Sequence, residues 1–137
     1  AAMAAVTCLG ADGVQIGTRF ALAEESSASD EFKKLCIGLS EGDTMLSLKK
    51  LSPTRLIKNK FFEDVTEAEN RGASADEIRE LLGRGRSRIG IFEGDLTEGE
   101  LEIGQITSMV RKIESVDDIM KDIIAEYNDT LKRVSKL

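Results

Sequence analysis

The chain has 137 residues. This is enough for a domain with a hydrophobic core, but a complete (β/α)8 barrel needs about 250 residues. The formal charge of −6 argues against binding to nucleic acid or to an anionic membrane surface. Because the sequence contains no histidine, neither a histidine-based metal site nor a catalytic triad is expected, and we predict no metal ligand.

The first 20 residues predict a helix, a short strand and a second helix. Residues 1–9 are rich in alanine and predict a helix, which the Asp12-Gly13 turn signal follows. Val14-Gln15-Ile16 is a short apolar run that predicts a buried strand. Gly17-Thr18 comes next, before a helix expected from Arg19. Backbone N–H groups at such a junction favour an anion, and a glycine leaves room for a phosphate.

The segment Gly10–Phe20, GADGVQIGTRF, resembles the last strand of a group of flavin-dependent barrels. These are the enoyl-acyl carrier protein reductase II enzymes and the related nitronate monooxygenases, which are 2-nitropropane dioxygenase-like. Weaker matches occur in the expected order at Glu24-Glu25-Ser26, Asp43-Thr44, Arg55–Asn59, Glu93-Gly94-Asp95 and Gly104-Gln105.

The resemblance implies an α/β fold, the carboxyl-terminal part of a (β/α)8 TIM barrel followed by a mostly helical appendage. Residues 1–25 would form the last helix and strand of the barrel. Residues 26–137 would form the helical extension, with a short strand pair near residues 44–59. The resemblance also implies that Gln15, Ile16, Gly17 and Thr18 contact the phosphate of FMN. Catalytic residues would lie upstream of Ala1, so none is assigned here.

The function implied by the resemblance is reduction of enoyl-acyl carrier protein by NADH or NADPH through FMN, in fatty acid synthesis. A nitronate monooxygenase using the same flavin site is the close alternative. A second alternative is a non-enzymatic, acidic helical interaction domain, which would leave the Gln15–Thr18 motif unexplained. The partner is then enoyl-acyl carrier protein or a small nitronate, and we expect a homodimer.

The rest of the chain predicts helices around one strand pair. Ser29 can cap a helix that buries Phe32, Leu35, Cys36 and Leu39. Residues 44–48 predict a strand, and residues 55–59 predict either its partner or the start of a helix. Further helices are expected at residues 61–70, 75–82, 101–113 and 116–134, the third after the capping-box spacing of Thr97 and Glu100.

Two features of the sequence leave alternatives open. The Gly104-Gln105 pair either faces the flavin, as the resemblance implies, or permits close helix packing. The basic run Arg84, Arg86 and Arg88 is either a solvated loop or a docking spot for an acidic carrier or a nucleotide phosphate.

The two cysteines, Cys8 and Cys36, belong to no Cys-x-x-Cys pair. Each lies in an apolar helical stretch, so we expect two buried free thiols. Free thiols suggest a reducing, cytoplasmic compartment.

Overall fold

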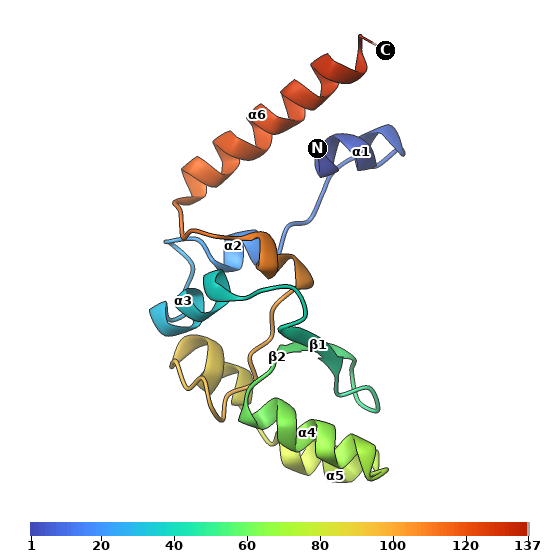
Figure 1. Ribbon diagram of the computed structural model, residues 1–137, viewed down its shortest axis with the longest axis vertical. Coiled ribbons are helices and arrows are strands. Elements are labelled where there is room, and N and C mark those ends of the chain that lie inside the picture. Colours follow the sequence, from blue (N-terminus) through green and yellow to red (C-terminus); the bar gives the residue numbers. More distant parts are fainter. Residues whose placement is uncertain (137) are drawn as a thin grey trace. The chain divides into compact units, whose positions relative to one another are not determined.

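The computed structural model describes residues 1–136, which form helices and one two-stranded sheet (Figure 1). The α-helices are α1 (Ala2–Cys8), α2 (Thr18–Ala21), α3 (Asp30–Gly38), α4 (Lys60–Asn70), α5 (Ala75–Leu82) and α6 (Val116–Val134). The strands are β1 (Thr44–Ser47) and β2 (Thr54–Ile57). A π-helical turn η1 (Arg88–Phe92) and a 3-10 helix η2 (Gln105–Met109) complete the set. No helix among these residues is both long and apolar enough to cross a bilayer.

The described chain divides into two compact units. Unit 1 contains residues 1–26 together with residues from 114 onward, so the last helix belongs with the first two. Unit 2 contains residues 27–113 and therefore holds the sheet and the remaining helices.

Unit 1 is built from α1, α2 and α6, and both shorter helices contact α6. Ala4, Leu22, Ala23 and Ile119 are its buried apolar residues. The hydroxyl oxygen of Ser115 accepts the N–H of Asp118 at 3.1 Å and so caps the start of the last helix. Acidic residues in its first turn and basic residues in its last turn complement the helix dipole.

In the described chain, residues 14–16 form no strand, although the sequence predicts the last strand of a barrel at this place. Residues 13–17 have no strand partner there and run as a loop into α2. A strand exists only when a neighbour accepts and donates its backbone hydrogen bonds, and none is available to this short apolar run. Val14 is consequently 41% exposed.

The strand pair predicted near residues 44–59 is confirmed in unit 2. β1 and β2 are antiparallel, with Thr44 opposite Ile57 and Ser47 opposite Thr54. A third segment extends the pairing on the other side of β2. There the N–H of Ile57 donates to the carbonyl of Leu101 at 2.9 Å, and the N–H of Ile103 donates to the carbonyl of Arg55 at 3.2 Å.

The helix predicted over residues 101–113 is therefore wrong. Leu101 and Ile103 are buried whereas Glu102 is exposed, an alternation that belongs to a strand-like segment. The preceding turn is capped by Asp95, whose carboxylate accepts the N–H groups of Thr97 and Glu98 at 3.0 and 2.9 Å. These two backbone hydrogen bonds lower the pKa of Asp95. Only η2 remains helical in this region.

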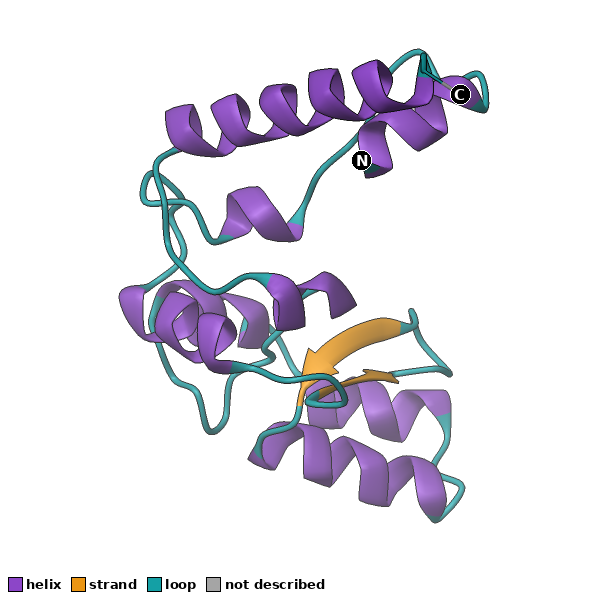
Figure 2. Ribbon diagram, turned by 45° about the horizontal axis from the view of Figure 1, so that its top comes forward, coloured by secondary structure: helices purple, strands orange, loops and turns teal. Residues whose placement is uncertain are grey.

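The helices predicted over 61–70 and 75–82 are confirmed as α4 and α5, which lie side by side (Figure 2), and α4 also contacts β1. Ser74 and Glu77 form a complete capping box at the start of α5. The core between these elements is apolar throughout. Its buried members are Leu48, Leu56, Phe61, Phe62, Val65, Ala68, Ala73 and Ile78.

Two glycines make the closest backbone approach in unit 2. A methyl group at Gly90 would lie 2.7 Å from the Leu101 side chain and 3.0 Å from the Cα of Gly99. A methyl group at Gly99 would lie 2.7 Å from the backbone nitrogen of Gly90 and would overlap the Gly90 Cα and the Asp95 carbonyl oxygen. This contact brings η1 against the segment that pairs with β2, so both positions require glycine.

We expect the Gly99→Ala substitution to lower the free energy of unfolding by about 2–3 kcal/mol, because the added methyl group meets backbone atoms that cannot move aside. Gly38→Ala is the matched control, since a methyl group at Gly38 meets nothing within 4 Å. Urea unfolding of both full-length variants measures the difference. Equal midpoints for the two variants would contradict the packing described here.

Candidate functional site

The predicted phosphate-binding residues lie together at the entrance to α2. Gln15 and Gly17 are exposed, whereas Ile16 and Thr18 are half-buried. Gly17 is the N-cap residue of α2, and no side chain caps this end of the helix. The helix expected from Arg19 thus begins one residue earlier, at Thr18.

The surroundings of Gly17 fit a phosphate group. A methyl group built on Gly17 would meet nothing within 4 Å in the described part of the chain, so the space beside its backbone is open. The amide N–H groups of Gly17 and Arg19 donate no backbone hydrogen bond among residues 1–136. Free amides beside an open space at the start of a helix can donate to phosphate oxygens. That four residues contact FMN stays a prediction; these are Gln15, Ile16, Gly17 and Thr18.

Three contacts hold the segment after this site to the start of α6, and no local sequence pattern indicates them. The Arg19 guanidinium forms an ion pair with the Glu114 carboxylate through Nη2 and Oε2. The Glu24 N–H donates to the Glu114 carbonyl at 2.9 Å. The Glu25 carboxylate accepts the Val116 N–H at 2.9 and 3.0 Å. These partners are about 90 positions apart, which is why local pattern does not reveal them.

The basic run is not a single cationic patch. The guanidinium of Arg86 donates to the carbonyls of Leu82 at 3.0 Å and Glu98 at 2.7 Å, and it stacks on the Phe61 ring at 4.7 Å. Arg88 pairs with Glu93 at 2.9 Å. Arg86 therefore caps the end of α5, and its guanidinium is occupied within the protein. The three arginines do not act together as a docking site.

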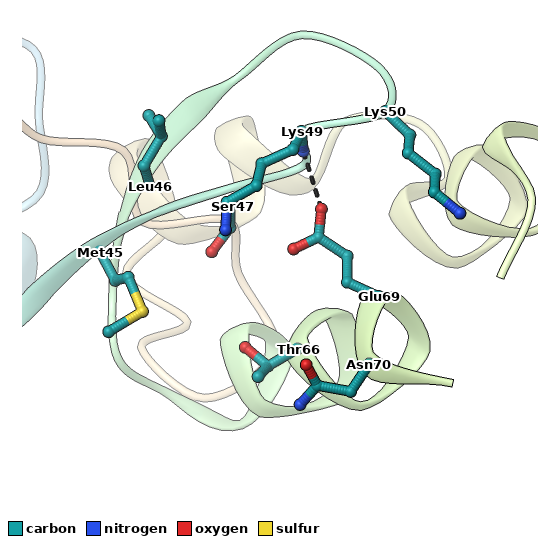
Figure 3. A pocket seen from close by; sticks show the side chains of 8 residues that line it. All are labelled: Met45, Leu46, Ser47, Lys49, Lys50, Thr66, Glu69 and Asn70. Carbon is teal, nitrogen blue, oxygen red and sulfur yellow. Dashed lines mark hydrogen bonds between the residues drawn. The ribbon is translucent and has the colours of Figure 1, made fainter. Parts of the chain in front are cut away.

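A pocket of about 330 Å³ lies between the hairpin and α4 (Figure 3). The charged groups of Glu69 and Lys50 in its lining are used by the fold. The Glu69 carboxylate accepts the Lys49 N–H at 2.8 Å. The Lys50 ammonium donates to the carbonyls of Gly72 and Ala73 at 3.2 and 2.5 Å, at the end of α4. These contacts tie the hairpin loop to α4.

Gln105 lies at the start of η2, on the rim of a second cavity of about 420 Å³. Ile106 and Met109 on the same cavity are exposed. Gly104 is the N-cap residue of η2, a 3-10 helix that contacts α3, and it lies in no α-helix. Among the described residues, no group of cysteine and carboxylate side chains is placed to hold a metal ion.

Comparison with known proteins decides the family. The family model described as nitronate monooxygenase matches residues 1–126. The chain belongs to the nitronate monooxygenase family. This is a family of FMN-dependent oxidoreductases, and the membership confirms the resemblance carried by the Gly10–Phe20 segment.

Solved structures agree with this membership. FabK from Thermotoga maritima is 32% identical, with a TM-score of 0.87 over 98% of this chain and 42% of FabK. Its M276A mutant is 30% identical, with a TM-score of 0.81 over 98% of this chain and 40% of the mutant. A nitroalkane oxidase from Streptomyces ansochromogenes, 24% identical, shares the fold with a TM-score of 0.74 over 97% of this chain and 38% of the oxidase.

The chain thus spans about two-fifths of the length of these proteins. It corresponds to part of the TIM-barrel fold of this family, in a mixed α/β arrangement that is mostly helical.

The two cysteines differ in their surroundings. Cys36 is buried, as predicted, but the expectation for Cys8 is wrong, because this side chain is exposed at the end of α1. Burial raises the pKa of the Cys36 thiol to about 12, and its hydrogen bond with Thr107 only partly opposes this shift. Cys36 is therefore a protonated core residue at neutral pH and not a nucleophile.

We expect native full-length protein to react with maleimide at Cys8 and not at Cys36. At pH 8 the raised pKa reduces the thiolate population of Cys36 by roughly a thousandfold, and burial blocks access to it. Mass spectrometry of labelled peptides locates the reaction, and labelling in denaturant is the control that should modify both residues. Rapid modification of Cys36 in the native protein would contradict this assignment.

Proposed function

We propose that the full-length protein is an FMN-dependent oxidoreductase that reduces enoyl-acyl carrier protein with NADH or NADPH. The observation that carries this proposal is the likeness to FabK over 98% of the chain at 32% identity. We take FabK as a reductase of the kind that the Gly10–Phe20 segment resembles. The nitroalkane oxidase shares the fold at lower identity and supports the alternative less.

In this proposal the chain supplies one half of the phosphate-binding site. The amides of Gly17 and Arg19 donate to the phosphate, and the open space beside Gly17 admits it. Bound FMN would carry hydride between the nicotinamide and the enoyl thioester. The chain's own residues hold and orient the cofactor, and none of them is assigned a proton-transfer step.

The nitronate monooxygenase alternative keeps the same phosphate site and changes only the substrate. The family description favours it, since that description names nitronate oxidation. Family membership argues against the second alternative, an acidic helical interaction domain, because this membership accounts for the Gln15–Thr18 motif. The homodimer, the carrier-protein partner and the cytoplasmic location stay predictions.

We expect Gly17→Val in the full-length protein to weaken FMN binding at least about tenfold, the equivalent of losing one hydrogen bond to a charged group. The valine side chain would occupy the open space beside residue 17 in which we place the phosphate. Gly13→Val is the matched control, because Gly13 also has open surroundings and lies four residues upstream in the same loop. Fluorescence titration with FMN measures both. Unchanged affinity in Gly17→Val would show that the phosphate binds elsewhere.

A comparison of substrates separates the two enzymes. We expect crotonyl thioester to stimulate oxidation of NADH or NADPH by the FMN-loaded protein, and we expect an alkyl nitronate with oxygen to be turned over more slowly. The ratio of the two kcat/KM values is the measurement. A ratio that favours the nitronate would replace the reductase with the monooxygenase and would leave the phosphate site intact.

A further inference from the structure

The position of the proposed phosphate site depends on α2, a helix that is too short to be stable without tertiary contacts. α2 has four residues and no side-chain cap. Isolated helices shorter than about 12–15 residues are marginal in water, so tertiary contacts must fix α2. Leu22 and Ala23 are buried just after it, and such apolar contacts have no preferred direction.

Arg19 supplies the missing directional contact. It follows Thr18 in the first turn of α2, and its pairing with Glu114 is largely shielded from solvent, since the two side chains are 24% and 9% exposed. The other terminal nitrogen of Arg19, Nη1, is buried and has no hydrogen-bond partner among residues 1–136. Among the described residues, Glu114 is thus the ion-pair partner of Arg19.

Glu114 is itself held by the backbone. Its carbonyl accepts the Glu24 N–H at 2.9 Å, and Ser115 then caps α6. The carboxylate that pairs with Arg19 is therefore placed by the rigid start of a 19-residue helix. An ion pair anchored in this way fixes both the distance and the direction of the guanidinium.

We propose that Glu114 is a positioning residue for FMN, which acts through Arg19 to orient the Gly17 and Arg19 amides toward the phosphate. This inference rests on the proposed function. It makes the start of the last helix part of the cofactor site, although Glu114 does not touch the cofactor.

Binding of FMN and riboflavin to the full-length protein tests the inference, because riboflavin lacks the phosphate. Glu114→Gln removes the charge that holds Arg19 and keeps the shape of the side chain. We expect this variant to bind FMN about tenfold more weakly and riboflavin with unchanged affinity. Asp129→Asn is the matched control, since it removes an exposed pair with Arg133 on the same helix and should change neither affinity.

A second variant guards against general unfolding. Glu114→Asp keeps the charge with a shorter reach, so we expect it to recover part of the FMN affinity, again with no change for riboflavin. Equal losses of FMN and riboflavin, or no loss of either, would overturn the positioning role and leave the proposed function standing. A wild-type protein that binds no FMN would overturn the proposed function and this inference with it.

Discussion

The side chain of Asn59 connects the start of α4 to the turn at residues 95–99. Its carbonyl oxygen accepts the Phe62 N–H at 3.0 Å and so begins α4. Its amide nitrogen donates to the carbonyls of Leu96 and Gly99 at 3.0 and 2.9 Å. Both amide hydrogens are used in this way, which leaves no donor of this half-buried group unsatisfied. The turn at residues 95–99 is thereby held against the start of α4, and the chain that leaves it is directed alongside β2.

Local signals explain what the sequence predicted well. Ser29, Ser74 and Ser115 each precede a helix and accept an N–H from its first turn, and such caps depend on residues three positions apart. The hairpin and the buried faces of α4 and α5 follow from short-range patterning in the same way. The helix expected after Thr97 failed because its evidence was equally local. Asp95 takes the Thr97 amide that the capping box would have used, and the Glu100 amide donates to the Arg86 carbonyl instead. Pairing with β2, more than 40 positions away, determines the backbone of Leu101–Ile103.

The candidate site shows the same division between local and long-range information. Gln15 to Thr18 form one continuous motif, so the sequence indicates them without knowledge of the fold. Glu114 is 95 positions from Arg19, and nothing in the pattern around either residue marks them as partners. Residues 14–16 show that a clear local signal can also be insufficient. Their apolar character indicates a strand, but strand formation depends on neighbours, and the described residues offer none to them.

The Arg19–Glu114 pair is better understood as a determinant of geometry than of stability. Removing two charges from water costs about as much free energy as their attraction returns, so a shielded pair contributes little net stability compared with apolar side chains of the same size. An apolar contact would, however, tolerate small rotations of a four-residue helix, whereas an ion pair with defined directions does not. Such a rotation would move the amides of Gly17 and Arg19 relative to a bound phosphate, whose hydrogen bonds weaken steeply with angle. A directional contact beside these amides therefore preserves the one property of α2 that phosphate binding requires.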